Sequence, residues 1–312
     1  MAQAIFGILV FPGFLFLCVA GVFAEFFDRK FHARLQNRKG PPWFQPVADF
    51  VKLCAKEDIV PEEADPFMFK AMPVFALAAV AAPIFYIPVW GADALFSFEG
   101  DLIVVLYLLT IPTLTFFLAG WYSTSLFSMI GAVRCLTQLF AYEVPLFLAL
   151  LAPALLADSW SITGLVRYYS DHPFYWLFNI IGFAVSLVVL LGKLEKVPFD
   201  IPEAETEIVA GAFTEYSGRL LAFFRMVIDI EMVVAASLIA AVFLPFGLGF
   251  GPIVGFALYL LKVTFIIAVV SLLRTIFARL RIDQMTDFCW RWIAPAAILQ
   301  LVINIMLKGV IR

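Results

Sequence analysis

Long apolar runs separated by short polar stretches form the main pattern along this 312-residue chain. A helix that crosses a hydrocarbon core about 30 Å thick needs about 20 such residues. The runs lie near residues 4–25, 68–90, 101–126, 139–157, 174–194, 219–243, 252–274 and 290–309. The pattern predicts an all-α integral membrane protein, with about eight transmembrane helices in a single transmembrane domain over residues 1–312. No small-residue cleavage site follows the first run, so we interpret it as a retained helix.

Composition agrees with a membrane protein and narrows the chemistry. Apolar residues make up 63% of the chain and charged residues only 14%, unlike a soluble domain. The four cysteines have no C-x-x-C spacing and there are only two histidines, so we expect no cofactor and no metal ion in this chain. Soluble-enzyme motifs are absent, and the basic residues flank membrane spans, which does not support nucleic-acid binding.

Basic residues are concentrated in alternate loops of the predicted topology. The loop after the seventh run contains Arg279 and Arg281, whereas the second, fourth and sixth loops contain Arg167 as their only basic residue. The positive-inside rule therefore places the odd-numbered loops in the cytoplasm and both termini outside. The first loop is the most basic, and carries Arg29, Lys30, Arg34, Arg38, Lys39, Lys52 and Lys56.

The first cytoplasmic loop, about residues 26–67, is long enough to contain structure of its own. Beyond the break at residues 40–42, the pattern predicts an amphipathic helix lying in the membrane interface. Such a helix is either a surface anchor or a docking platform for a soluble partner, and the residues favour neither. Its apolar positions are Trp43, Phe44, Val47, Phe50, Val51 and Cys54, set against Asp49, Lys52 and Lys56.

Residues 193–219, KLEKVPFDIPEAETEIVAGAFTEYSGR, form the most acidic segment between two predicted spans. Only Lys193, Lys196 and Arg219 oppose its acids, which are Glu195, Asp200, Glu203, Glu205, Glu207 and Glu215. These acids are either exposed residues near a helix start or protonatable groups that the neighbouring spans partly bury. Burial raises carboxyl pKa values into the working range, and we favour this second interpretation, an acidic coupling loop.

A short helix is predicted inside this acidic segment. Asp200 followed by Glu203 fits a helix start, and Pro202 fits the first helical turn. The prediction places Glu203 and Glu207 one turn apart on the same face, near the positive end of the helix dipole.

Ionisable residues inside the predicted spans are further functional candidates, because a charge at that depth requires a partner or water. Glu143 lies early in the fourth span, Asp229 and Glu231 lie well inside the sixth, and Lys262 lies near the middle of the seventh. Arg225 is placed to pair with Asp229 at i,i+4, a contact that could be purely structural. Together with the acids of the loop, these residues could form a relay for protons.

Several motifs, in the right order along nearly the whole chain, resemble the NuoH-like family, whose members are membrane components of respiratory complex I. The segment VPFDIPEAETEIVAGAFTEYSG resembles the family's signature loop, and Tyr142-Glu143-Val144 resembles its motif in the fourth span. The end of the seventh span is similar through Lys262, Arg274, Arg279, Arg281, Asp283 and Gln284. The first loop is similar through Gln36, Arg38, Gly40, Pro41, Gln45, Pro46, Asp49, Lys52, Leu53, Lys56, Glu57 and Asp58.

The resemblance implies a subunit at the junction of a membrane arm and a hydrophilic redox arm, in the plasma membrane of a prokaryote. Its partners are expected to be hydrophilic redox-arm subunits on the cytoplasmic side, antiporter-like and small membrane subunits, and lipid. The implied relay comprises Glu143, Asp200, Glu203, Glu205, Glu207, Glu215, Asp229, Glu231 and Lys262. The implied docking residues are Arg29, Arg34, Arg38, Gln45, Asp49, Lys52, Arg274, Arg279, Arg281 and Asp283.

Departures from the quinone-reducing pattern point to another branch of the family. The first loop is about six residues shorter, Lys193 and Lys196 occupy positions where that pattern has Glu and Arg, and Ile228 replaces a glutamate. These features are more similar to membrane-bound, energy-converting hydrogenases and related sulfur reductases. In those complexes the partner arm carries iron–sulfur clusters and a nickel–iron or modified active site.

The sequence therefore predicts a noncatalytic subunit that docks the redox arm and links electron transfer to H⁺ or Na⁺ translocation. Three alternatives remain open at this stage. The chain could be a quinone-binding subunit of an NADH:quinone oxidoreductase, a stand-alone ion transporter or a purely structural anchor. No internal repeat or paired broken-helix pattern favours the transporter.

Overall fold

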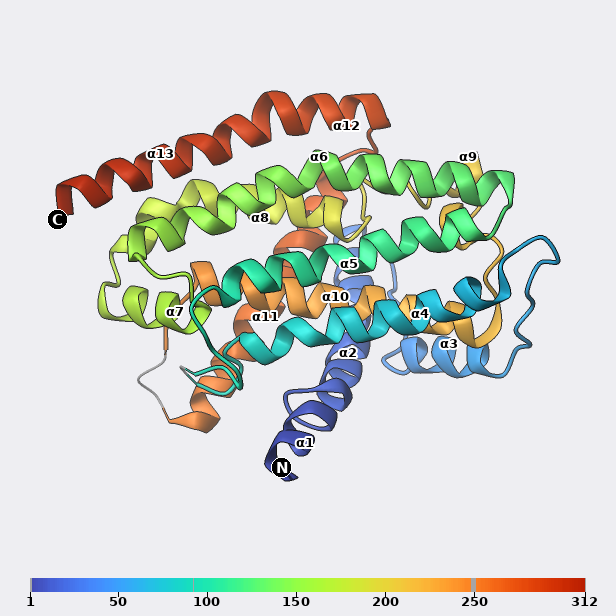
Figure 1. The fold of residues 1–312 in the computed structure, drawn as a ribbon, viewed down its shortest axis with the longest axis horizontal. Helices are drawn as coiled ribbons and strands as arrows, with labels where there is room; N and C mark the ends of the chain where they lie inside the picture. Colours follow the sequence, from blue (N-terminus) through green and yellow to red (C-terminus); the bar gives the residue numbers. More distant parts are fainter. Residues whose placement is uncertain (1, 92, 248–250, 312) are drawn as a thin grey trace.

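The computed structural model describes residues 2–91, 93–247 and 251–311, and within these ranges the chain forms helices and no strand (Figure 1). Short 3₁₀ segments extend α4, precede α8 and follow α9, and one π-helical turn joins α12 to α13. The α-helices are α1 (Ala2–Leu9), α2 (Phe14–Leu35), α3 (Gln45–Cys54), α4 (Pro66–Ala81), α5 (Asp101–Tyr122), α6 (Leu126–Ala157), α7 (Ile162–Asp171), α8 (Ile180–Lys193), α9 (Glu205–Ile208), α10 (Gly218–Phe243), α11 (Pro252–Ile276), α12 (Ile282–Phe288) and α13 (Ala294–Ile311).

Eight helical segments are long and apolar enough to cross a membrane, which confirms the predicted all-α membrane protein. They are Ile5–Leu35, Pro66–Tyr86, Asp101–Tyr122, Leu126–Ala157, Tyr175–Lys193, Gly218–Phe243, Ile253–Ile276 and Ile282–Val310. The chain is a multi-pass membrane protein.

Two helices continue well beyond the apolar runs that predicted them. Helix α2 extends to Leu35, so Arg29 and Arg34 lie on its last turns rather than in a loop. Helix α6 begins at Leu126, and its 32 residues correspond to roughly 48 Å. Glu143 therefore lies in the middle of this helix, not early in it as predicted. Polar residues within each extension ended the apolar run but not the helix.

The first, fifth and seventh loops meet at one end of the bundle, hereafter the loop end. Asp58 of the first loop forms an ion pair with Arg219 at the start of α10, with Oδ2 and Nη2 2.7 Å apart. Asp200 of the acidic segment pairs with Arg279 of the seventh loop at 3.2 Å. These contacts bring together the loops that the positive-inside rule assigned to one side.

The two chain termini lie toward the opposite end. Lys308 near the C-terminus pairs with Asp158, which follows α6, at 2.5 Å. Near the N-terminus, the ring of Phe11 lies 5.4 Å from that of Trp90 and 5.6 Å from that of Phe256, both on the far side of the bundle from the acidic segment. This arrangement agrees with an even number of crossings.

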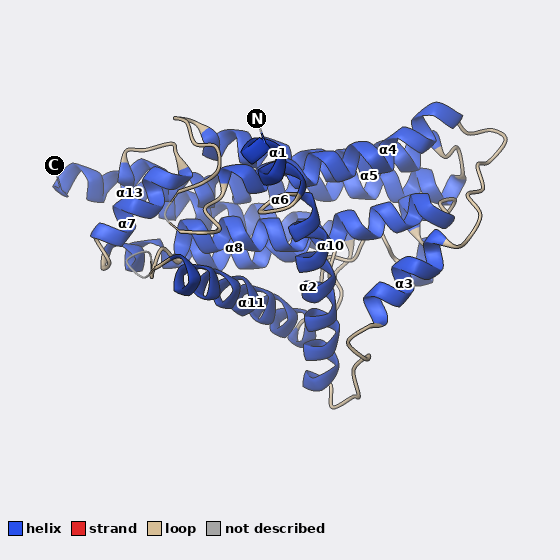
Figure 2. Ribbon diagram, turned by 90° about the horizontal axis from the view of Figure 1, so that it is seen from below, coloured by secondary structure: helices blue, strands red, loops and turns tan. Residues whose placement is uncertain are grey.

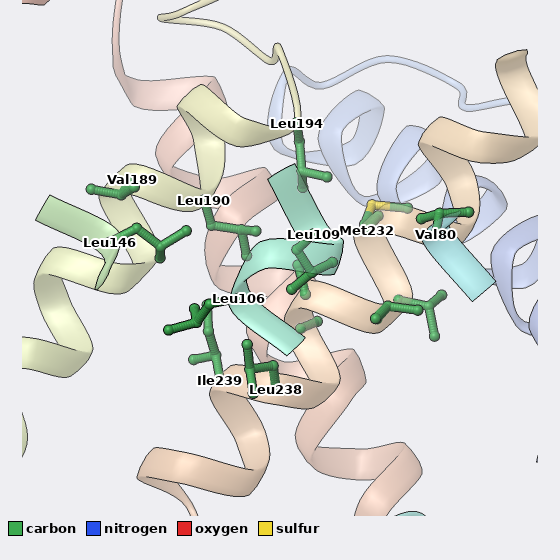
Figure 3. Close-up of a cluster of buried hydrophobic side chains, with 14 of the residues drawn as sticks. Val80, Leu106, Leu109, Leu146, Val189, Leu190, Leu194, Met232, Leu238 and Ile239 are labelled. Carbon is green, nitrogen blue, oxygen red and sulfur yellow. The ribbon is translucent and has the colours of Figure 1, made fainter. Parts of the chain in front are cut away.

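Helix α10 is the central element of the bundle. In its most apolar 18-residue stretch 83% of the residues are buried, the highest share among the eight spans. Its side chains Leu238 and Ile239 pack with Leu106 of α5 and Leu190 of α8 (Figure 3). Because its neighbours surround α10, any charged group on its inner faces must find a partner inside the protein.

Helices α2 and α11 cross the others steeply, whereas α4, α5, α6 and α10 run nearly side by side (Figures 1 and 2). Gly21 allows α2 to approach α10 closely, since a Cβ there would lie 3.2–3.3 Å from backbone and Cβ atoms of Asp229 and from Ile230 N. At the loop end, α2, α3, α10 and the acidic segment line a common space.

Candidate functional site

A cavity of about 700 Å³ lies at the loop end between α2, α3, α10 and the segment that joins α8 to α10. We call it the charged cavity. It is lined by apolar side chains of α2, α3 and α10 and by eleven charged residues, six acidic and five basic. The charged residues are Glu25, Arg29, Asp49, Glu195, Lys196, Asp200, Glu203, Arg225, Asp229, Arg274 and Arg279.

The segment between α8 and α10 forms turns rather than the helix predicted from Asp200. The only α-helix in its described part is the single turn α9, which begins at Glu205, so Glu203 lies in the preceding turn and faces the cavity. Gln138 of α6 holds the segment, because its Nε2 donates to the carbonyl oxygens of Gly192 at 2.7 Å and Phe199 at 2.9 Å. Tertiary hydrogen bonds of this kind fix the backbone where local sequence suggested a helix.

Ion pairs at the outer rim of the cavity bind the acidic segment to its neighbours. Glu207 bridges Arg134 of α6 at 2.6 Å and Arg279 at 3.4 Å, and Glu203 pairs with Arg225 of α10 at 3.2 Å. The hydrogen bond from Arg134 lowers the pKa of Glu207 below its usual value. Glu207 is half exposed. Because its pKa is lowered, it stays ionised near neutral pH and stabilises the acidic segment through its ion pairs rather than accepting a proton.

Asp28 of α2 binds two of the cationic residues that line the cavity, Lys196 and Arg274. It is fully buried and accepts from Lys196 at 2.5 Å, from Arg274 at 3.0 Å and from the hydroxyl of Ser271. One carboxylate thus holds two cations and joins α2, α11 and the acidic segment. Sequence reasoning missed Asp28 because it ended the first span at residue 25, which placed Asp28 in the loop.

A second charged pair lies inside the bundle, and we call it the inner pair. Lys193 and Glu231 are 2.9 Å apart, and both side chains are only 1% exposed. Lys193 also donates to the carbonyl oxygen of Leu109 at 2.5 Å and lies 5.8 Å from the ring centre of Tyr142. Glu143 follows Tyr142 on α6, and its buried Oε2 has no hydrogen-bond partner within the described part of the chain.

The structure separates other residues that the sequence grouped in one relay. Asp229 lines the charged cavity, whereas Glu231, two residues later, points into the bundle and pairs with Lys193. Lys262 donates to the carbonyl oxygen of Phe246 and borders a small pocket with Ala241, ten residues and so roughly 15 Å along α10 from Glu231. Lys262 therefore lies toward the opposite end from the acidic loop.

Three further predictions have different outcomes. The structure gives Arg225 an ion pair with Glu203 rather than the predicted contact with Asp229. Glu215 lies in the turn before α10 and is not among the residues that line the cavity. The side chain of Glu205 lies outside the described part of the structure.

The residues predicted to dock a partner all lie at the loop end, but several are already engaged. Asp49 on α3 accepts from Arg29 at 3.2 Å and from Gln45 at 2.9 Å. Arg274 and Arg279 form the ion pairs with acids described above. The exposed members of the set are Arg29, whose side chain is held by Glu25 and Asp49, and Arg34, Arg38, Lys52, Arg281 and Asp283.

Among the described residues, no cluster of three His, Cys, Asp or Glu side chains is arranged to hold a metal ion. The charged cavity instead offers carboxylates in near balance with cations, an arrangement that suits water and proton exchange better than tight coordination of a cation.

Comparisons with known proteins agree over most of the chain. The sequence model of a family described as NADH dehydrogenase matches residues 6–305. A subunit of the NADH-quinone oxidoreductase from Thermomicrobium roseum is 36% identical over 317 residues, covering 93% of this chain and 91% of the relative. Subunit 8 of the NADH-quinone oxidoreductase from Thermus thermophilus is 34% identical over 298 residues, covering 91% and 81%. A chain of the membrane-bound sulfane sulfur reductase, an archaeal respiratory membrane complex, superimposes with a TM-score of 0.82 at 27% identity, covering 93% of this chain and 96% of that one.

Proposed function

The chain belongs to the NADH dehydrogenase family, and from this membership we propose that it is the coupling subunit at the membrane junction of a complex I-like respiratory complex. In this role it anchors the redox arm and links electron transfer to the movement of H⁺ or Na⁺. It performs no redox chemistry of its own.

The observation that carries this proposal is the inner pair, Lys193 with Glu231, placed next to the acidic segment. Two charges that are 1% exposed require a functional or structural reason, because their desolvation is costly. Glu143, in the middle of α6, adds a carboxyl oxygen that has no hydrogen-bond partner among the described residues. A charge change at the cavity acts on these groups through a medium of low dielectric constant, where electrostatic forces are strong.

The loop end is the surface we assign to the redox arm. It carries the exposed residues Arg34, Arg38, Lys52, Arg281 and Asp283. Its excess of basic residues favours the cytoplasmic side of a prokaryotic plasma membrane, with both termini outside. Iron–sulfur clusters and a nickel–iron or modified centre belong to the partner subunits, and antiporter-like and small subunits continue the membrane arm.

The test uses the purified complex in proteoliposomes, with Glu143→Gln and Glu231→Gln examined separately. Both changes keep the shape of the side chain and remove the ionisable group. We expect the ions moved per electron pair to fall at least about tenfold, while subunit composition stays intact. Glu99→Gln is the matched control, because its Oε1 accepts from Trp160 N at 2.9 Å and the amide oxygen preserves that bond. Unchanged coupling in both inner variants contradicts the proposal.

A second candidate function is the binding of a quinone-type head group in the charged cavity. The volume of about 700 Å³ and the apolar side chains Pro46, Phe50 and Met226 favour it. Quinone analogues added to the complex distinguish the two functions. Competitive inhibition that is weakened by Phe50→Ala supports quinone binding, whereas turnover insensitive to the analogues leaves the coupling function alone.

A further inference from the structure

We propose that Glu195 is the proton-exchange group between the charged cavity and the inner pair, a role that rests on the proposed coupling function. Glu195 lines the cavity, yet it lies only two residues beyond Lys193, whose ammonium group forms the inner pair. Of the cavity's acids, it is the one whose carboxyl group also bonds to a buried side chain of α6, through Cys135.

The backbone at Glu195 is a strained conformation for a glutamate. Its φ is +50°, in the left-handed region, immediately after helix α8 and its cap residue Leu194. Glycine or asparagine is the usual residue at such a position, because a Cβ is disfavoured there. We take this position of a glutamate as support for a role of its carboxyl group.

Contacts from α6 hold this part of the chain in place. The thiol of Cys135, buried on α6, donates to Glu195 Oε1 at 3.2 Å. The same helix provides Gln138, whose bonds to Gly192 and Phe199 fix the backbone on both sides of Glu195. The carboxyl group is therefore positioned by α6 rather than free to follow solvent.

The surroundings of Glu195 favour its protonated form. Its pKa is raised to about 8, chiefly by burial, with a contribution from the carboxylate of Glu203 in the cavity and a smaller one from Glu231 of the inner pair. The hydrogen bond from Cys135 and the charge of Arg225 on α10 act in the opposite direction. A group with this pKa binds and releases protons near physiological pH, which is the requirement for an exchange site.

The proton path that follows is short. Glu195 takes a proton from cavity water and, when a charge change at the cavity lowers its proton affinity, releases the proton toward Glu231 and Glu143. The carboxylate is then reprotonated from the cavity side. Each step moves one proton and needs no oxidant, reductant or metal ion.

The test compares three substitutions in the purified complex. Glu195→Gln keeps an acceptor for Cys135 but cannot exchange a proton, and Glu195→Asn also suits the left-handed backbone. We expect both to lower the ions moved per electron pair at least about tenfold, with Asn as stable as the native residue or more so. Glu195→Asp, which retains an ionisable group, recovers part of the coupling, and Glu99→Gln again serves as control.

Two further readouts separate proton exchange from a structural role. Coupling in the native complex should fall as pH rises through about 8, and this pH dependence should vanish in Glu195→Gln. Redox-triggered infrared difference spectra should lose one protonated-carboxyl band in the same variant. Normal coupling in both amide variants, or an unchanged pH profile, overturns the role of Glu195.

The outcomes also separate this inference from the proposed function. If Glu143→Gln and Glu231→Gln abolish coupling but Glu195→Gln does not, the coupling function stands and Glu195 is not its exchange group. If none of the three variants changes coupling, the proposed function itself fails.

Discussion

Replacement of Lys193 by methionine should strongly destabilise the middle of the bundle. The change removes the ammonium group that lies 2.9 Å from Glu231. The carboxylate of Glu231, whose side chain is only 1% exposed, is then left without its cation. It also removes the 2.5 Å hydrogen bond to Leu109 O and the contact with the ring of Tyr142. Methionine has a similar length, so the main effect is the loss of charge compensation.

The expected size of the effect follows from the burial of both partners. Removing one member of a buried ion pair costs about 3–5 kcal/mol, because the other charge stays in a medium of low dielectric constant. The double variant Lys193→Met with Glu231→Met replaces both charges by apolar chains of similar volume. It should lie within about 1 kcal/mol of the native protein, or be more stable.

Buried Cys135 provides the assay within the intact complex. Its side chain is 1% exposed, so a thiol reagent reaches it only when this region opens. A loss of about 3–5 kcal/mol corresponds to a rate of modification about a hundred to several thousand times faster, at tenfold for each 1.4 kcal/mol. Mass spectrometry of the peptide that contains Cys135 measures this rate for the native protein, the single variant and the double variant.

Two results would refute this reasoning. If Lys193→Met is modified no faster than the native chain, the inner pair does not stabilise this region. If the double variant is modified as fast as the single one, the effect comes from lost packing and not from the unpaired charge.

Two further predictions concern the ion pairs around the cavity. Asp28→Asn leaves Lys196 and Arg274 without their shared carboxylate, so the contact of α2 with α11 should weaken by about 3–5 kcal/mol. A clearly lower thermal midpoint of the complex is expected, and an unchanged midpoint contradicts the bridging role. Arg134 lowers the pKa of Glu207, so the stabilisation it provides is present above the ordinary carboxyl pKa of about 4.3 and is lost only as pH falls through the lower folded value. The protection of the α9 amides from hydrogen exchange, relative to their intrinsic exchange rate at each pH, should therefore stay constant from pH 8 to about 5, and Glu207→Gln should lower this protection at neutral pH. Equal protection of the α9 amides in both proteins contradicts the stabilising role of the Arg134–Glu207 ion pair.

The membrane spans could be predicted from the sequence because they depend on local composition. A helix that crosses a bilayer satisfies its own backbone hydrogen bonds, so length and hydropathy suffice to identify it. The alternation of basic loops likewise predicted which loops share an end, and the pairs Asp58–Arg219 and Asp200–Arg279 lie at that end. The helix boundaries were less accurate, because polar extensions such as the last turns of α2 are no longer apolar.

The candidate site could be predicted only in part. The acidic segment and Glu143 were identified as ionisable residues in an apolar chain, and several acids do line the charged cavity. Local patterns nevertheless gave the wrong start for α9 and the wrong partner for Arg225, because Gln138 and Glu203 determine these features from distant positions.

The sequence by itself determined that this protein crosses the membrane eight times and concentrates its acids in one connection. Those properties follow from hydropathy and charge along the chain, which each segment carries alone. The tertiary structure decided that Lys193 meets Glu231, that Asp28 holds Lys196, and that Glu195 lies between cavity and interior. Helical phase and the crossing of α2 over α10 set these contacts, and both depend on packing between segments far apart in sequence.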